Sequence, residues 1–92
     1  MATFKKDPNA VLDYTFDWTS YLTPLVDTIS SVTWIISSGL TKVSQSNTTT
    51  TATAFISGGV VGKTETLTCR ITTNSVPPRV DDRSVLLKIT ER

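Results

Sequence analysis

The sequence predicts an all-β fold in which two antiparallel sheets pack face to face. Apolar and polar residues alternate along several short segments, and turn residues separate these segments at intervals of roughly 8–12 residues. No segment shows the apolar stripe of a helix. Thr and Ser dominate the polar residues, with 18 and 10 copies, and the β-branched Thr side chain fits the half-exposed surface of a strand.

The first ten residues predict an extended arm. Pro8 fixes its own φ and pushes Asp7 toward an extended backbone, which opposes a helix at this position. A mobile arm could dock on another protein, and the candidate docking residues are Phe4, Lys5, Lys6 and Asp7. Simple disorder is the alternative for the same segment.

The first strand is expected over residues 12–18, where Leu12, Tyr14, Phe16 and Trp18 alternate with polar residues. Residues 19–27 contain Pro24 and predict a connection without regular structure.

A second strand is expected over residues 29–37, with Val32, Trp34 and Ile36 on one face. Ile29 is out of phase with Val32, which predicts a bulge at Ser30 and Ser31.

The middle of the chain predicts two more strands. Residues 40–45 form a short, weakly patterned strand, and Ser46-Asn47 forms a tight turn. The Thr run from 48 to 51 then enters a strand that presents Ala52, Ala54 and Ile56 on one face. A flexible linker is the alternative for the Thr run, but the alternation continues from it directly into Ile56.

The last third predicts the two longest strands. The glycines of residues 57–63 predict a hairpin turn, and residues 64–73 follow as a strand whose inner face includes Cys69. A loop stiffened by Pro77-Pro78 spans residues 74–82. The final strand covers residues 83–90 and points Val85, Leu87 and Ile89 inward.

Together these elements predict one domain over residues 1–92, an immunoglobulin-like antiparallel β-sandwich of six to seven strands with residues 1–10 as the extended arm. The candidate structural core contains Tyr14, Phe16, Trp18, Trp34 and Cys69.

The composition disfavours nucleic-acid and membrane partners. Nine Lys and Arg stand against eight Asp and Glu, for a net charge of +1, and such a balance disfavours nucleic-acid binding. No run approaches the ~18–20 apolar residues that span a membrane, and the polar N-terminus does not resemble a signal peptide. We therefore expect neither a nucleic-acid partner nor a membrane partner, and a single cysteine is consistent with a reducing cytoplasm.

The residues that carry site chemistry are sparse. Without histidine and with one cysteine, the chain has almost no ligands for zinc or other transition metals, and we expect no cofactor. Cys69 lacks the histidine that would activate it as a nucleophile. Asp13 and Asp17 are about 13 Å apart on a strand, too far for a glycosidase pair. We expect no catalytic residues and no enzyme.

Two further patterns have structural explanations. Gly62-Lys63-Thr64 ends like a phosphate-binding loop, but Ser57 stands where the first glycine of that motif belongs. Asp81-Asp82 is too small an acidic group for calcium, and cross-strand pairing with Arg70 or Arg83 is the expected role.

Aromatic residues could also form a sugar-stacking platform, but three of the four candidates sit at positions that are expected to face inward. The four are Tyr14, Trp18, Tyr21 and Trp34. Core packing is therefore the preferred explanation for them.

Three sequence blocks, in this order and spacing, resemble a known family. They are Lys6-Asp7-Pro8-Asn9-Ala10-Val11-Leu12-Asp13-Tyr14-Thr15-Phe16-Asp17-Trp18, then Asp27-Thr28-Ile29 leading to Trp34, and Arg70-Ile71-Thr72-Thr73 with Asp82-Arg83-Ser84, with Ser57-Gly58-Gly59 between the last two. The array is similar to phage fibre–tail adaptor proteins, which are small virion proteins of tailed bacteriophages, and the likeness extends from about Lys6 to Arg92.

The resemblance implies a structural virion component at the tail or neck that links fibres or neighbouring tail proteins. Its expected partners are portal, neck, tail or fibre proteins, in a homo-oligomeric ring assembled in the host bacterial cytoplasm. Addition of a strand to a neighbour's sheet edge is the expected docking mechanism. A capsid decoration protein and a carbohydrate-binding β-sandwich module are the alternatives.

Overall fold

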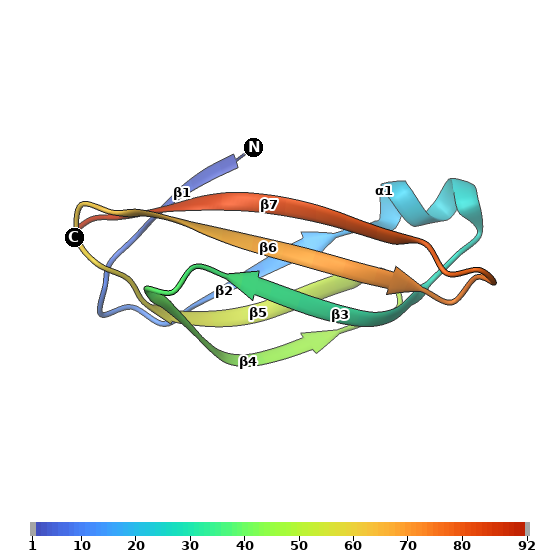
Figure 1. The fold of residues 1–92 in the computed structure, drawn as a ribbon, viewed down its shortest axis with the longest axis horizontal. Coiled ribbons are helices and arrows are strands. Elements are labelled where there is room, and N and C mark those ends of the chain that lie inside the picture. The colour runs from blue at the N-terminus through green and yellow to red at the C-terminus, as the bar shows by residue number, and fades with distance from the viewer. Residues whose placement is uncertain (1, 92) are drawn as a thin grey trace.

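The structure is a computed structural model that describes residues 2–91, and within this range it contains seven strands and two short helices (Figure 1). The strands are β1 (Ala2–Lys6), β2 (Leu12–Asp17), β3 (Ile29–Ile36), β4 (Leu40–Asn47), β5 (Thr51–Gly58), β6 (Thr64–Thr73) and β7 (Val80–Ile89). A single helical turn, α1 (Thr19–Leu22), and a 3₁₀ turn, η1 (Thr23–Leu25), connect β2 to β3.

The described strands form two sheets, with strand orders β1-β7-β6-β3 and β2-β5-β4. Every pair is antiparallel except β1 with β7, which is parallel. The sheets share one apolar core, so the predicted all-β sandwich is confirmed. The immunoglobulin-like topology stays a prediction. The molecule is elongated along the strands, with principal extents of 44 × 23 × 17 Å (Figure 1).

The period of two places one face of each strand in the core. On β2, Tyr14 and Phe16 stand opposite Ala54 and Ala52 of β5, so that large aromatic side chains lie beside small ones. This pairing of large with small residues lets the side chains of β2 and β5 pack closely between the sheets. The buried apolar residues are Phe16, Trp18, Leu22, Ile29, Leu40, Ala52, Ala54, Ile56, Leu67, Cys69, Ile71, Val85, Leu87 and Ile89.

The predicted bulge at the start of β3 is confirmed. The β3–β6 register shifts between Ile29 and Ser31, and Ile29 turns into the core with 5% of its surface exposed. The extra residue places both Ile29 and Val32 on the inner face, although an uninterrupted strand would place them on opposite faces.

The turn between β4 and β5 begins two residues later than predicted. β4 continues through Asn47, and the turn is built by Thr48, whose Oγ1 accepts hydrogen bonds from the backbone N–H groups of Thr50 (3.2 Å) and Thr51 (3.0 Å). A Thr hydroxyl can close a turn in this way, and strand propensity alone does not reveal it.

The connection over residues 19–27 exists as predicted, but it is helical where no helix was expected. Asp17 accepts a hydrogen bond from the Thr19 N–H at 2.9 Å, and the Leu22 N–H donates to the Trp18 carbonyl at 2.9 Å. Pro24 stands at the start of the 3₁₀ turn, where its missing N–H costs nothing. A four-residue helix is too short to create a visible period.

The glycine segment is a connection between the two sheets, so the predicted hairpin turn is wrong. β5 belongs to the three-stranded sheet and β6 to the four-stranded sheet. Gly59 has φ +111°, and a Cβ at this position would lie 2.6 Å from Ile89 Cδ1. Glycine is therefore required here because the backbone passes over a core side chain.

The prediction of a mobile N-terminal arm is wrong for residues 2–6. These residues form β1 and pair in parallel with β7, from Ala2 opposite Val85 to Lys6 opposite Ile89. The final strand offers an edge with open backbone groups, and pairing with β1 satisfies them.

The last strand, β7, begins at Val80 and not at the expected residue 83. Its early residues stay in the ladder because Asp82 stands opposite Arg70 of β6, and the Arg70 Nε donates to Asp82 Oδ1 at 2.7 Å. The Arg70 Nη2 donates to Asp82 Oδ2 at 3.0 Å, which confirms the cross-strand pair expected from the sequence.

Candidate functional site

The candidate docking residues Phe4, Lys5, Lys6 and Asp7 lie on β1 and on the turn that follows it. Phe4 points between the sheets and keeps 45% of its surface exposed. Lys5 is exposed on the outer face, in register with Lys88 of β7. The Asp7 carboxylate accepts a hydrogen bond from the Asn9 N–H at 2.8 Å, which shapes the turn after β1.

Lys6 is fully buried and stabilises the fold from within. Its ammonium donates to the backbone carbonyls of Asp7 (3.0 Å), Ala10 (2.7 Å) and Gly58 (2.8 Å). Burial lowers the pKa of Lys6, and the nearby Asp7 charge partly opposes this shift. The side chain ties β1 to the end of β5 in the other sheet, so it is not available to a partner.

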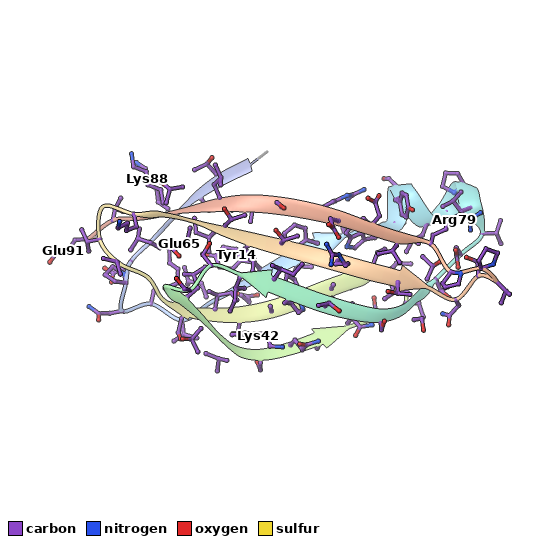
Figure 2. All side chains as sticks on the ribbon, in the orientation of Figure 1. Tyr14, Lys42, Glu65, Arg79, Lys88 and Glu91 are labelled. Carbon is purple, nitrogen blue, oxygen red and sulfur yellow. The ribbon has the colours of Figure 1, made fainter. Side chains whose placement is uncertain are left out.

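A cavity of about 330 Å³ opens between β1 and β2. It is lined by Phe4, Asp13, Tyr14, Thr15, Phe16 and Val85. The rings of Phe4 and Tyr14 are 5.9 Å apart between centroids, and Tyr14 lies between the two layers (Figure 2). Burial, with a smaller contribution from Asp13, raises the pKa of Tyr14. Its hydroxyl is buried and has no hydrogen-bond partner among residues 2–91.

The candidate core residues occupy the space between the sheets. Phe16, Trp18 and Cys69 are buried, whereas Tyr14 and Trp34 are half-buried against them. Phe16 and Trp34 meet edge to face, with ring centroids 5.6 Å apart.

Trp18 is fully buried under the guanidinium of Arg83, whose Cζ lies 4.3 Å from the ring centroid. Trp18 therefore presents no open ring face on which a sugar could stack.

The environment of Cys69 opposes a chemical role for its thiol. The side chain has no exposed surface, and burial raises its pKa to about 11. A thiol with this pKa remains protonated at neutral pH, whereas a nucleophilic cysteine needs the thiolate.

The acidic residues are dispersed or paired. Asp13 and Asp17 are exposed on the outer face of β2, two residues to either side of Thr15, and Asp82 is held by Arg70. Among residues 2–91, no group of three His, Cys, Asp or Glu side chains is placed to hold a metal ion. Within the same residues, neither helix has the length and apolar character that crossing a membrane requires.

The end of the molecule that carries the β6–β7 loop exposes two aliphatic side chains, a feature that the sequence analysis missed. Val26 is 95% exposed and Val76 is 96% exposed, and they lie on two separate loops. We call this region the loop end, made by residues 25–28 and 74–79 (Figure 1).

Polar contacts fix the two loops of the loop end to each other. Arg79 Nη1 donates to Asp27 Oδ2 at 3.0 Å, and the Asp27 side chain is only 4% exposed (Figure 2 labels Arg79). Asn74 binds Thr28 twice, from its backbone N–H to the Thr28 carbonyl (3.1 Å) and from Nδ2 to Oγ1 (2.8 Å). The loop end is therefore a fixed surface.

Val26 adopts a backbone conformation that disfavours its own side chain. Its φ of 49° and ψ of 49° lie in the left-handed region, and it is the only non-glycine residue with positive φ in the described chain. A β-branched residue in this region stores strain, and such strain concentrates at functional positions. The Pro77-Pro78 loop was a sequence signal for a rigid exposed loop, but nothing in the sequence reveals the φ of Val26.

Comparison with known proteins gives one family. The family model described as "Podophage GP4 fiber-tail adaptor protein gp77" matches residues 6–88. No curated protein matches the chain.

Proposed function

Because this chain belongs to the podophage fiber–tail adaptor family, we propose that it joins the fibres or neighbouring proteins of a phage tail to one another as a structural part of the virion. The observation that carries this proposal is the family match over residues 6–88, which covers strands of both sheets from β2 to β7. The family name describes a tail component. We base the choice of binding regions on the surface of the fold.

An adaptor must hold two neighbours at once, and the fold offers two separate protein-binding regions. One is the loop end, with Val26 and Val76. The other is the outer edge of β1, with Phe4 and Lys5. A rigid sandwich between the two regions would hold both partners at a defined spacing.

The loop end suits a partner with an apolar recess. Aliphatic side chains that are almost completely exposed gain free energy when a partner removes them from water, about 1.5–3 kcal/mol for a fully buried Val. The Asp27–Arg79 ion pair and the Asn74–Thr28 hydrogen bonds keep the loops in place before binding, so little entropy is lost on docking. We assign this region to the tail or fibre protein.

The edge of β1 suits strand addition. Its neighbour on one side is β7, and no strand of the described chain lies on its other side. Phe4 and Lys5 are exposed and remain candidates for docking. Lys6 and Asp7 instead make hydrogen bonds within the turn that follows β1. Copies that pair at this edge would leave their loop ends free, and such pairs could be arranged as a ring around the tail, assembled in the host cytoplasm before the virion is released.

The proposal includes no catalysis. The family is described as an adaptor, and the buried Cys69, with its raised pKa, is unsuited to covalent chemistry. A sugar-binding role would need an open aromatic face, but Trp18 is buried and Trp34 is half-buried against Phe16.

The test measures binding of the purified protein to the separately purified fibre and tail proteins of the parent phage. We expect both to bind. Val26→Asp or Val76→Asp should weaken one of the two interactions by at least about tenfold, because a buried charge replaces an apolar contact. The matched control is Val43→Asp on β4, a similar change at a Val that is 57% exposed and outside the loop end.

Binding to capsids alone would favour the decoration alternative. Binding to glycans, with no affinity for fibre or tail protein, would favour the carbohydrate-binding alternative. Either result would refute the adaptor proposal.

A further inference from the structure

The edge strands β1 and β2 lie on the same side of the sandwich, one in each sheet, and together they form what we call the β1–β2 seam. The chain reverses over residues 7–11, so the two strands run in opposite directions (Figure 1). The rings of Phe4 and Tyr14 meet across the seam, with centroids 5.9 Å apart, and the 330 Å³ cavity opens beside them. We infer from this contact that the two residues stand at a similar height along the seam.

The backbone of both strands offers unpaired groups along the seam. The Lys6 carbonyl accepts from the Thr90 N–H at 2.9 Å, and the Trp18 N–H donates to the Thr50 carbonyl at 2.8 Å. Backbone groups alternate in direction along a strand, so Lys5, like Thr3, points its N–H and C=O away from β7. By the same rule, Asp13 and Thr15 point theirs away from β5.

The two sides of the seam carry opposite charge on their outer faces. On β1, Lys5 is exposed and stands in register with Lys88, and Figure 2 shows Lys88 close to this edge. On β2, Asp13 and Asp17 are exposed and stand opposite Phe55 and Thr51 of β5. Like charges side by side on a sheet are unfavourable, so the lysine pair would gain from an acidic neighbour.

The other two edges of the sandwich carry features that oppose strand pairing. β4 has a register shift between Lys42 and Ser44, and Lys42, although it stands opposite the buried Ile56, keeps its side chain exposed (Figure 2 labels Lys42). β3 has its bulge between Ile29 and Ser31. Bulges are an established means of keeping an edge strand from pairing. The registers of β1 and β2 run without a shift.

We propose that two copies of this chain pair through their β1–β2 seams about a two-fold axis parallel to the strands, with β1 of each copy adding to β2 of the other. This axis exchanges the two layers, so the four-stranded sheet of one copy continues into the three-stranded sheet of the second. It also keeps the height along the strands, so Lys5 faces Asp13 of the second copy and Phe4 faces Tyr14.

This register allows both backbone hydrogen bonds and a favourable side-chain ion pair between the two copies. Lys5 and Asp13 both direct their backbone groups at each other, as do Thr3 and Thr15, which is the requirement for hydrogen-bonded antiparallel pairs. Lys5 and Asp13 also lie on the same outer face of the joined sheet, where they form an ion pair. A junction of β1 with β1 would instead bring four lysines, Lys5 and Lys88 of each copy, to one edge.

The first experiment is sedimentation equilibrium of the purified chain. We expect twice the 10.0 kDa mass of one copy at micromolar concentration. Lys5→Glu should weaken the dimer by at least about tenfold, because each copy loses an attraction and gains a repulsion at both junctions. Asp13→Lys should do the same, and the double variant Lys5→Glu/Asp13→Lys should restore the dimer. Lys42→Glu, on the blocked β4 edge, is the control and should leave the dimer unchanged.

The second experiment tests the register by cross-linking. In opposed hydrogen-bonded residues the Cα atoms are roughly 5.5 Å apart, which a disulfide spans. The variant Thr3→Cys/Thr15→Cys should therefore oxidise to a covalent dimer, whereas Thr3→Cys alone should not. Within one copy these two positions point to opposite outer faces and do not meet.

A single-copy mass at every concentration would refute the dimer. So would a double charge variant that fails to restore it, or a cysteine pair that forms no covalent dimer. The dimer does not depend on the adaptor role. A dimer without affinity for fibre or tail protein refutes only the proposed function, and a monomer that binds them refutes only the dimer.

Discussion

At the scale of single residues, Lys6 stabilises this small domain from within. Its buried ammonium satisfies three backbone carbonyls, two in the β1–β2 connection and one at the end of β5. A sandwich of this size has a modest core, so a polar contact that joins its two sheets has a large relative effect.

Lys6→Met should lower the free energy of unfolding by about 2–3 kcal/mol, because it removes a charged donor and leaves buried carbonyls without a partner. Urea denaturation followed by fluorescence measures this. Lys63→Met, at an exposed position, is the control and should change stability by no more than about 0.5 kcal/mol. Equal effects of the two changes would show that the three hydrogen bonds are not stabilising.

Val26 is the opposite case, a residue that reduces stability where it stands. Val26→Gly should raise the free energy of unfolding by about 1 kcal/mol, because glycine adopts the left-handed conformation without steric cost. The same variant should bind the tail or fibre protein less tightly. Val60→Gly, at an exposed loop position without positive φ, should give no gain in stability. A loss of stability in Val26→Gly would contradict the assignment of strain.

At the scale of elements, the loop end depends on the ionised form of Asp27. Burial alone would raise the pKa of Asp27, but hydrogen bonds from the Thr28 backbone and from Thr73, Ser75 and Arg79 lower it overall. A carboxyl whose pKa is lower in the folded state stabilises the fold above its unfolded value near 3.8, and this contribution is lost as the pH falls through the folded value.

We therefore expect the free energy of unfolding to fall as the pH drops below about 4, and the fall should be smaller in Asp27→Asn. Chemical denaturation at a series of pH values measures this. Arg79→Gln removes the cation and keeps the other hydrogen bonds, so its acid profile should lie between those of the wild type and Asp27→Asn. Parallel profiles for all three proteins would disprove the role of this ion pair.

Element by element, the sequence was most informative where alternation was long and regular. The strand over residues 64–73 has the predicted bounds, and the bulge at Ser30-Ser31 could be predicted because Ile29 is out of phase. The boundaries near Thr48 and Val80 were missed because local hydrogen bonds decide them, through the Thr48 hydroxyl and the Arg70–Asp82 pair. β1 was missed as a strand because only its partner, distant in sequence, orders it.

The candidate site was harder to predict than the fold. The sequence indicated the N-terminal docking segment but not the burial of Lys6, because that burial depends on the distant β5, whose Gly58 carbonyl accepts from the Lys6 ammonium. The loop end depends on the φ of Val26 and on contacts between two loops about 50 residues apart, and neither leaves a periodic pattern. Pairing through the β1–β2 seam could not be predicted either. It depends on which way the backbone N–H and C=O groups of β1 and β2 point, and that follows only from the observed strand register.

At the scale of the whole molecule, Cys69 reports on global opening. Its side chain lies at the centre of β6 between the sheets, with no exposed surface. Labelling by a thiol reagent at neutral pH should be slowed at least about a thousandfold relative to the urea-unfolded chain, because access requires the sheets to separate. Labelling kinetics followed by mass spectrometry measure this, and rapid labelling of the native protein would show that the sandwich opens locally near β6.

The parallel pairing of β1 with β7 has a mechanical consequence. Ala2 lies opposite Val85 and Lys6 opposite Ile89, so a pull applied at Ala2 and at the end of β7 acts along both strands in opposite senses. The hydrogen bonds of this pair are then loaded in shear and must break together, whereas the bonds of a hairpin pulled open at its end break one at a time. The two strands act as a clamp, and the sandwich should resist a stretching force applied at these points far better than a force that peels β1 sideways.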